Sequence, residues 1–242
     1  MEITLTANAG VCVSFGDTCV LVDALHEKSS RFSPVSADMV QKVMEGAFGE
    51  PALYLVTHAH GDHYSEALAT AFLEKYPRCI FAGPVPAPAD AQSRAILVEG
   101  RTGEAFAGPV RLAWEQLVHE GDEYADVVNY GYRVECGGES FIVLGDASSR
   151  ETRRGLQALV LPDGTDAALV NFPVIVLRHG RQALQGLPIR RVVGFHLPFA
   201  PDDEDGYRKS AFGALSKAGR ETGLRVDLLS EEGQTVTIAP QP

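Results

Sequence analysis

The chain has 242 residues, of which 45% are hydrophobic and 22% charged, so it can bury a substantial core and shows no disordered or low-complexity segment. Its formal net charge of -11 disfavours nucleic acid and anionic membrane surfaces as partners. The four cysteines form no C-x-x-C pair, the first residues do not resemble a signal peptide, and no apolar run approaches the roughly 20 residues of a membrane-spanning helix. We therefore expect a cytoplasmic protein with reduced cysteines, and the sequence leaves its oligomeric state open.

Short strand-like segments dominate the chain, and helical segments interrupt them. Strands at 3–7, 11–15 and 19–23 are expected to form a meander, and a polar loop covers residues 24–36. A helix over 37–47, with Ser36 as its N-cap, precedes a strand in PALYLVT and a second helix after it. Further strands are expected at 79–83, 95–99, 109–118, 130–136, 141–146, 168–171, 189–196, 226–230 and 234–239, and further helices at 174–184 and 206–221.

The order of these segments indicates the fold class. Regular alternation of strand and helix would favour one parallel sheet, and this chain alternates less regularly. Neither a linker nor a tandem repeat is evident. We therefore predict a single α/β domain over residues 1–242, in which two mixed, mostly antiparallel β-sheets pack together with helices outside.

The most informative stretch is LYLVTHAHGDHYS, residues 53–65. An apolar run ends at Thr57, and four side chains that can bind metal follow within six positions: His58, His60, Asp62 and His63. On extended backbone His58 and His60 project to the same side, whereas Gly61 allows a turn that sends the next two side chains elsewhere. This geometry suits two adjacent metal ions, and imidazole with carboxylate is a donor set typical of zinc or iron.

A polar loop whose histidines only satisfy backbone groups is the alternative interpretation of this stretch. The chain has seven histidines, and three of them fall within these six positions. A single histidine would favour the structural interpretation, but such a cluster favours a metal site.

The segment His58-Ala59-His60-Gly61-Asp62-His63 resembles the H-x-H-x-D-H motif of the metallo-β-lactamase superfamily. The opening stretch NAGVCVSFGDTCVLVDALH is also similar to the first strands of that family. The resemblance implies a four-layer αββα sandwich and seven metal ligands. They are His58, His60 and His119 for the first ion, Asp62, His63 and His196 for the second, and Asp146 as the bridge. It further implies that Asp23 supports the metal site from behind. We expect His179, on an exposed helix face, to be a bystander. His26 follows Asp23 closely and could line the mouth, but we expect it to lie in a solvated loop.

The resemblance implies a dinuclear metallo-hydrolase that holds two divalent ions, most often Zn²⁺, with Mn²⁺ or Fe as alternatives. Asp62 is expected to serve additionally as a catalytic proton acceptor. His60 stands where the flavodiiron branch has Glu, and no cysteine precedes the last histidine as in the commonest zinc β-lactamases. The helical C-terminal domain of glyoxalase II-like enzymes has little room here, and neither the added domain nor the RNA-clamping arm of the family's nucleases is evident. The chain therefore most resembles the compact bacterial branch of uncharacterised hydrolases and phosphorylated-lactone hydrolases. This resemblance implies a small-molecule substrate, which we expect to be a small ester, a lactone or a phosphodiester.

Candidate substrate-binding residues lie near the motif elements. Phe32, within the loop Arg31-Phe32-Ser33-Pro34, together with Tyr64 and Tyr130, is expected at the mouth of the site. Arg150, Arg153 and Arg154 follow Asp146 and either bind an anionic group of the substrate or form a solvated charged loop.

Two other functions remain open at this point. One is a mononuclear iron oxygenase on the same scaffold, acting on a thiol or persulfide. The other is a metal-stabilised binding protein without turnover, although a structural zinc needs only four closed ligands. Metal analysis separates these functions from hydrolysis.

Overall fold

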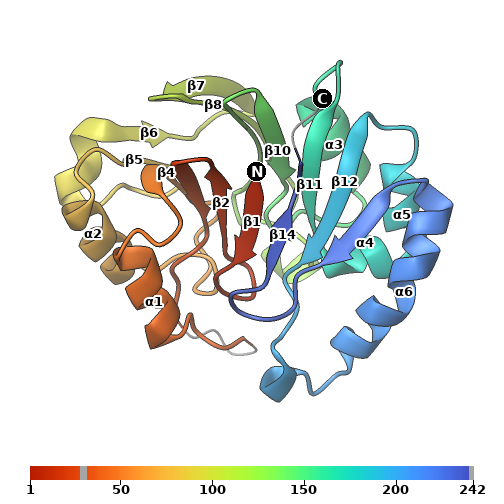
Figure 1. The fold of residues 1–242 in the computed structure, drawn as a ribbon. Coiled ribbons are helices and arrows are strands. Elements are labelled where there is room, and N and C mark those ends of the chain that lie inside the picture. Colours follow the sequence, from red (N-terminus) through yellow and green to blue (C-terminus); the bar gives the residue numbers. More distant parts are fainter. Residues whose placement is uncertain (28–31, 240–242) are drawn as a thin grey trace.

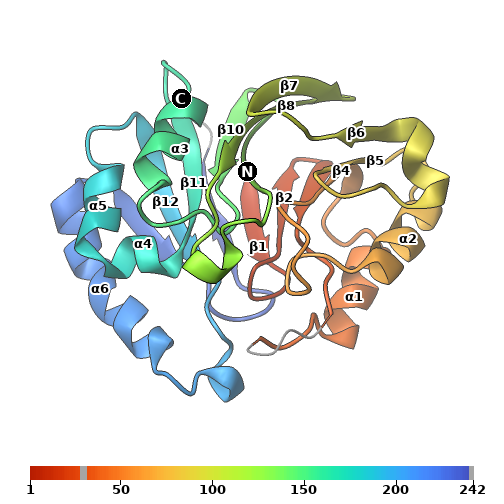
Figure 2. The same ribbon diagram turned by 180° about the vertical axis from the view of Figure 1, so that it is seen from behind.

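Two seven-stranded β-sheets face each other, and helices cover both outer faces, in a computed structural model that describes residues 1–27 and 32–239 (Figure 1). Helices α1 (Ala37–Met44) and α2 (Glu66–Lys75) lie on the first sheet. Four further helices lie on the second sheet: α3 (Thr152–Leu159), α4 (Phe172–Val176), α5 (Arg178–Leu184) and α6 (Tyr207–Thr222). The view from behind shows the same four layers, which confirms the predicted α/β sandwich (Figure 2).

The first sheet has the strand order β14-β1-β2-β3-β4-β5-β6. Neighbours are antiparallel from β14 to β3 and parallel from β3 to β6. The strands are β1 (Glu2–Leu5), β2 (Val11–Phe15), β3 (Thr18–Val22), β4 (Glu50–Leu55), β5 (Ile80–Gly83), β6 (Ala95–Leu97) and β14 (Thr235–Thr237).

The second sheet has the order β13-β12-β11-β10-β9-β8-β7, parallel from β13 to β10 and antiparallel from β10 to β7. Its strands are β7 (Thr102–Ala107), β8 (Val110–Leu117), β9 (Asn129–Cys136), β10 (Glu139–Val143), β11 (Thr165–Asn171), β12 (Ile189–Phe195) and β13 (Arg225–Leu228). Both sheets are therefore mixed as predicted, but antiparallel pairings are no more numerous than parallel ones, because βα connections build half of each sheet.

The core has three apolar layers, one between the sheets and one beneath each set of helices. Strand β4 shows how the sequence builds them. Leu53 and Leu55 point into the layer between the sheets, whereas Tyr54 and Val56 point into the layer beneath α1 and α2. Because both faces of the sheet are buried, the sequence here is a continuous apolar run from Leu53 to Val56. The end of this run at Thr57 marks the edge of the core.

The carboxyl ends of the parallel strands in both sheets meet at one end of the sandwich. Asp23 follows β3 and the histidine motif follows β4, while Asp146 comes shortly after β10 and His196 directly after β12. Ligand sites in open α/β sheets form at such strand ends. His119 reaches the same place from an antiparallel strand, β8, and pairs with Ala147 in an isolated β-bridge.

Three elements differ from the sequence prediction. Helix α3 and strand β7 were not expected, because one is a short segment with two arginines and a glycine and the other is a glycine-containing edge strand. The helix predicted over 174–184 is two helices, since Leu177 has extended backbone between α4 and α5.

Among the described residues, no helix has the length and apolar character that crossing a membrane requires.

Candidate metal centre

Three imidazoles from two sheets form the first triad, His58, His60 and His119. His58 Nε2 lies 3.1 Å from His60 Nδ1 and 3.4 Å from His119 Nε2. A tetrahedral ion with metal–nitrogen bonds of about 2.0–2.1 Å separates its ligand atoms by about 3.3 Å. The three nitrogens are therefore spaced as ligands of one ion would be.

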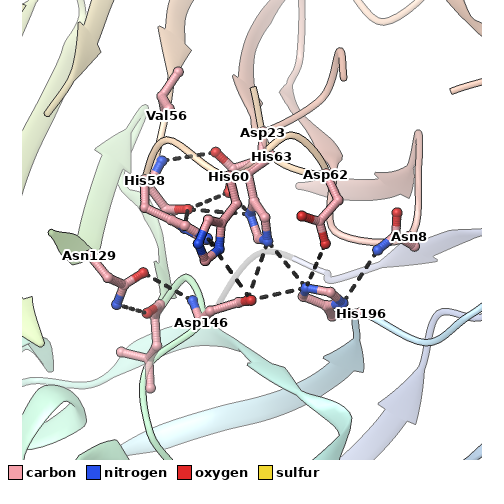
Figure 3. A network of polar contacts seen from close by, with 12 residues as sticks. Asn8, Asp23, Val56, His58, His60, Asp62, His63, Asn129, Asp146 and His196 are labelled. Carbon is pink, nitrogen blue, oxygen red and sulfur yellow. Dashed lines mark hydrogen bonds and ion pairs between the residues drawn. The ribbon is translucent and has the colours of Figure 1, made fainter. Parts of the chain in front are cut away.

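The second triad, Asp62, His63 and His196, lies directly beside the first (Figure 3). His63 Nε2 and His196 Nε2 are 3.1 Å apart, and Asp62 Oδ2 lies 3.9 Å from His196 Nε2. This triad has two imidazoles and one carboxylate, so it differs from the first in charge and in donor type.

Asp146 lies close to His63 and His196 (Figure 3), and its two oxygens face different triads. Its Oδ1 is 3.4 Å from His63 Nε2 and 3.2 Å from His196 Nε2. Its Oδ2 is 3.7 Å from His119 Nε2 and 4.0 Å from His58 Nε2. The structure thus brings together all seven residues that the sequence predicted as ligands, with Asp146 in the bridging position.

Asp23 organises two of these imidazoles through one carboxylate. It accepts hydrogen bonds from the backbone N–H of Thr57 (2.8 Å), from the Thr57 hydroxyl (2.6 Å) and from His63 Nδ1 (2.9 Å). Since the single hydroxyl proton of Thr57 goes to Asp23, its oxygen accepts the hydrogen bond from His58 Nδ1, 2.9 Å away. Asp23 therefore has the supporting position that the resemblance implied, acting on His63 directly and on His58 through Thr57.

These hydrogen bonds also decide which imidazole nitrogens carry lone pairs. His58 and His63 donate through Nδ1, and so does His119, whose Nδ1 lies 2.7 Å from the carbonyl oxygen of Glu120. In their neutral forms the three residues therefore keep Nε2 lone pairs, with those of His58 and His119 facing each other 3.4 Å apart and that of His63 facing His196 Nε2 at 3.1 Å. A cation is the group that such a converging set of acceptors fits.

Three asparagines support the site, and the sequence analysis identified none of them. Asn129 Oδ1 accepts from the backbone N–H of Asp146 at 3.0 Å, and Asn171 Nδ2 donates to Asp146 Oδ1 at 2.9 Å. Asn8 Nδ2 lies 3.4 Å from His196 Nδ1, while its buried Oδ1 has no partner among the described residues. A 180° flip of the Asn8 side-chain amide would let Oδ1 accept a hydrogen bond from His196 Nδ1. The Nε2 atom of His196 would then be free to bind a metal ion.

Backbone strain is concentrated at the same place. Among the described residues other than glycine, positive φ angles occur at Asp23 (48°) and His196 (61°), both of which belong to the site. Such conformations persist where the surrounding structure enforces them, and they occur preferentially at functional sites. Gly145 also has a positive φ of 55°, and a Cβ there would lie 2.3 Å from Asn129 Oδ1, so this position before Asp146 requires glycine.

The electrostatics at His58 and His60 of the first triad favour neutral imidazoles. Burial lowers the pKa of His58 well below its ordinary value, and the neighbouring His63 adds to the effect. Burial, together with His119, also lowers the pKa of His60.

The second triad has the opposite character. Burial acts to lower the pKa of His63, but the carboxylates of Asp146 and Asp23 outweigh it and hold this pKa well above the ordinary value. Burial likewise acts to raise the pKa of Asp146, but His196 and His63 outweigh it and hold that pKa well below the ordinary value. His63 and Asp146 thus form an ion pair when a proton occupies the site.

The expected mouth residues are only partly at the site. Phe32 packs edge-on against His196, with 4.9 Å between ring centroids, as expected for a residue at the mouth. Tyr130 contradicts the prediction, because it is 2% exposed, lies in the core between the sheets and donates its hydroxyl to Gly100 O. Tyr64 also turns away, since it packs against Phe81 in the layer beneath α1 and α2.

One aromatic residue at the site was missed. Tyr124, in the segment between His119 and β9, packs edge-on against His60 (5.0 Å) and His119 (5.2 Å). The sequence analysis gave this segment no role at the mouth. The acidic run that contains Tyr124 has no periodicity that would have assigned its ring to a surface.

The arginines after Asp146 do not face the metal centre. Arg153 donates to the carbonyl oxygens of Ala183 and Gln185, and Arg154 pairs with Glu115 and Glu151. Arg150 borders a surface hollow of about 610 Å³ that no predicted ligand lines. The lining residues are Ser149, Arg150, Arg153, His179, Gln182 and Ala183.

The remaining assignments have mixed outcomes. His179 is exposed as expected and contacts Ser149 Oγ at 2.9 Å. The expectation that His26 lies in a solvated loop is wrong, because its side chain is fully buried, and burial lowers its pKa. Its Nδ1 donates to Glu27 O at 2.8 Å. Arg31 lies outside the described residues.

No protein-family model matches this chain, and no curated protein does. Solved structures do resemble it. Igni18, a novel metallo hydrolase from the archaeon Ignicoccus hospitalis, aligns with a TM-score of 0.64 at 16% identity over 99% of both chains. YhfI from Bacillus subtilis, a metallo-β-lactamase fold protein, aligns at 0.59 and 13% identity over 97% of this chain and 98% of YhfI. CmlA from Streptomyces venezuelae, a diiron β-hydroxylase, aligns at 0.62 and 14% identity over 98% of this chain and 54% of CmlA.

These alignments establish the architecture. The chain has the metallo-β-lactamase fold, which confirms the fold that the motif resemblance implied. At such low sequence identity the likeness concerns the fold, and function has to be argued from the site itself.

Proposed function

We propose that this protein is a metal-dependent hydrolase that holds two divalent cations and acts on a small ester, lactone or phosphodiester. The observation that carries the proposal is the position of Asp146, whose two oxygens face different triads. A structural site would need one closed set of four ligands, whereas two triads that share a carboxylate fit a dinuclear centre.

The residues present fit such ions. His58, His60 and His119 would hold the first, Asp62, His63 and His196 the second, and Asp146 both. Nitrogen and oxygen donors without thiolate suit Zn²⁺, Mn²⁺ or Fe. When bound, a pair of such ions supplies a nucleophilic hydroxide near neutral pH and polarises the electrophilic oxygen of the substrate.

The protein's own groups contribute orientation and proton transfer. Asp23 and Thr57 fix the rings of His63 and His58, and Asn171 fixes Asp146 Oδ1. The carboxylate of Asp62 makes no hydrogen bond within residues 1–27 and 32–239, so it keeps an oxygen available to accept a proton. A buried carboxylate with a free oxygen beside the reacting groups is suited to general base catalysis.

An iron oxygenase is the second candidate function. It is favoured by one observation, the shared fold with CmlA, which is described as a diiron β-hydroxylase. The same imidazole and carboxylate donors accommodate iron. The two candidates differ in the metal they require and in whether the reaction consumes O₂.

Metal content and turnover together test the proposal. The purified protein is analysed for bound metals by mass spectrometry, loaded with Zn²⁺ or Mn²⁺, and assayed against matched lactones, thioesters, aryl esters and phosphodiesters. Two zinc or manganese ions per chain with turnover of at least one class would support hydrolysis. Bound iron with substrate-dependent O₂ uptake would instead support the oxygenase, and a loaded protein that turns over nothing would contradict both.

A further inference from the structure

Two aromatic rings flank the metal centre at its opposite ends. Phe32 packs against His196 of the second triad, and Tyr124 packs against His60 and His119 of the first. In Figure 3, His60 and His196 lie on either side of the Asp146 carboxylate. Phe32 therefore borders the second triad and Tyr124 the first, and the two triads share Asp146 between them.

The segment that carries Tyr124 is hydrogen-bonded to the loop that presents the bridging carboxylate. Glu120 donates its backbone N–H to Asp146 O at 2.8 Å and accepts through its side chain from the backbone N–H of Ser149 at 2.6 Å. Tyr124 then closes a short turn, donating to Gly121 O at 3.0 Å. The ring thus has a fixed relation to the centre and does not belong to an unattached loop.

Phe32 is anchored in a comparable way on the other side. Its neighbour Ser33 donates to Asp202, which lies in the segment that follows His196. The backbone N–H of Val35 donates to His26 O at 3.4 Å. The segment that carries Phe32 is therefore tied to elements on both sheets.

Tyr124 is not buried as a core residue would be. It is 42% exposed, and Val118 and Val128 at the two ends of the same segment are exposed as well. Apolar surface that remains open beside a reaction centre is typical of a ligand-binding wall. Tyr124 is exposed and Phe32 is half-buried, so each ring keeps accessible surface on which a flat group of a substrate could stack.

The charged residues near the mouth of the site indicate which ligand charge is preferred. The segments 119–128 and 197–206 contain no Lys or Arg. Their acidic residues are Glu120, Asp122, Glu123, Asp126, Asp202, Asp203, Glu204 and Asp205. Lys28 and Arg31 belong to a third neighbouring segment but lie outside the described residues. Arg208 donates to Pro198 O in the second of these segments, but it is paired with Glu231. Bound ions would themselves attract anions at the reacting bond, so this preference concerns the part of a ligand beyond the ions, where the described acidic residues favour neutral or cationic groups over anionic ones.

We propose that Phe32 and Tyr124 bind a flat apolar group next to the scissile bond, and that the preferred substrates are neutral or cationic aryl esters and lactones, not anionic esters or phosphodiesters. This inference rests on the proposed hydrolytic function for its chemistry, but the binding preference can be measured independently of turnover. Phosphodiesters thereby become the least favoured of the three substrate classes named above.

The test compares three 4-nitrophenyl esters with acyl groups matched in length, one neutral, one carrying trimethylammonium and one carrying carboxylate. Hydrolysis by the zinc-loaded protein gives KM and kcat. Calorimetry with the corresponding aryl ketones, which cannot be hydrolysed, gives binding without chemistry. We expect the neutral and cationic ligands to bind at least about tenfold more tightly than the anionic one.

Substitutions of Phe32 and Tyr124 test whether their rings bind the flat group. Tyr124→Ala and Phe32→Ala should each raise KM and the ketone Kd by about three- to tenfold, with a smaller change in kcat. Tyr124→Phe should recover most of the loss, since it keeps the ring. Phe106→Ala, at a 69% exposed aromatic on the edge strand β7, is the matched control and should change neither value. Metal content is measured for every variant, because Tyr124 contacts two candidate ligands.

The outcomes separate the two proposals. Ring-dependent binding of the ketones without hydrolysis of any ester would support this inference and contradict the hydrolytic function. Hydrolysis with equal or stronger binding of the anionic ligand, or with unchanged KM in both alanine variants at full metal content, would overturn this inference alone.

Discussion

The two triads are neighbours, yet the chain supports them with different chemistry. The first contains imidazoles only and is held by neutral groups, the Thr57 hydroxyl and the Glu120 carbonyl. The second contains the carboxylate of Asp62, and the buried carboxylate of Asp23 holds its His63. A histidine that donates to a neutral acceptor keeps the lone pair of its other nitrogen for a cation. A histidine that donates to a carboxylate tends to hold a second proton, which a cation has to displace.

This difference gives an expected order of metal binding. At neutral pH His58 and His60 of the first triad have lowered pKa values and need to lose no proton. His63 in the second triad has a raised pKa and must be deprotonated before it can bind. We therefore expect the first ion to bind with little pH dependence and the second to bind more tightly as the pH rises.

The largest effect is expected from removing the group that the triads share. Asp146→Ala should reduce kcat/KM for any hydrolysed substrate by at least about 10³-fold and lower the bound metal below two ions per chain, because neither triad then has its bridging ligand. Asp163→Ala, at an exposed aspartate outside the site, is the control. An Asp146→Ala protein with parental activity would remove the basis for a shared centre.

A smaller loss should follow from changing the carboxylate behind both triads. Asp23→Asn loses one of its acceptor oxygens toward Thr57 and His63, so both ions should bind about 10–100-fold more weakly in chelator competition. The second ion should be affected more, since Asp23 contacts His63 directly and His58 through Thr57. If Asp23→Asn weakened the first ion alone, this account of the second triad would be wrong.

The protonation of His63 can be measured in the metal-free protein. Its raised pKa stabilises the fold fully below the unfolded value of about 6.5, and this contribution is lost as the pH rises through the folded pKa. The lowered pKa values of His58 and His60 destabilise the fold only below about pH 6.5. We therefore expect the free energy of unfolding, measured in urea, to fall between about pH 6.5 and 8.

His63→Gln provides the comparison for this measurement. Without the titrating ring, the free energy of unfolding should be nearly constant over the same range. A parental protein whose stability stays constant or rises over that interval would show that His63 does not hold the proton.

The smallest effects should separate the triads from each other. Thr57→Val removes the hydroxyl between Asp23 and His58, and Asn8→Ala removes the amide beside His196. Each loses one hydrogen bond, so we expect about three- to tenfold weaker binding, of the first ion in Thr57→Val and of the second in Asn8→Ala. Thr57→Ser keeps the hydroxyl, so it should restore the affinity for the first ion. Equal weakening of both ions in both variants would show that the triads act as one unit.

The convergence of the candidate metal ligands was largely predictable from the sequence, because much of their spacing is local. The motif from His58 to His63 lies within six residues, and His119, Asp146 and His196 each follow a recognisable strand. Parallel strands in both sheets end at the same edge, so residues at strand ends converge. The layer architecture followed from the same pattern.

The supporting and substrate-facing residues were not predictable, because they depend on tertiary contacts. Asn8 reaches His196 across 188 positions of sequence, and Tyr124 belongs to a segment without periodicity. Tyr130 has the composition of a mouth residue, but its strand turns the ring into the core with Tyr132. Arg153 looked available for an anion, yet backbone carbonyls of the α5 region occupy its guanidinium.

Anomalous diffraction from crystals of the zinc-loaded protein tests the central claim most directly. Two peaks about 3.5–4 Å apart are expected. One should lie at His58, His60 and His119, the other at Asp62, His63 and His196, with Asp146 coordinating both. A single fully occupied peak, or two peaks of which only one contacts Asp146, would contradict a shared dinuclear centre.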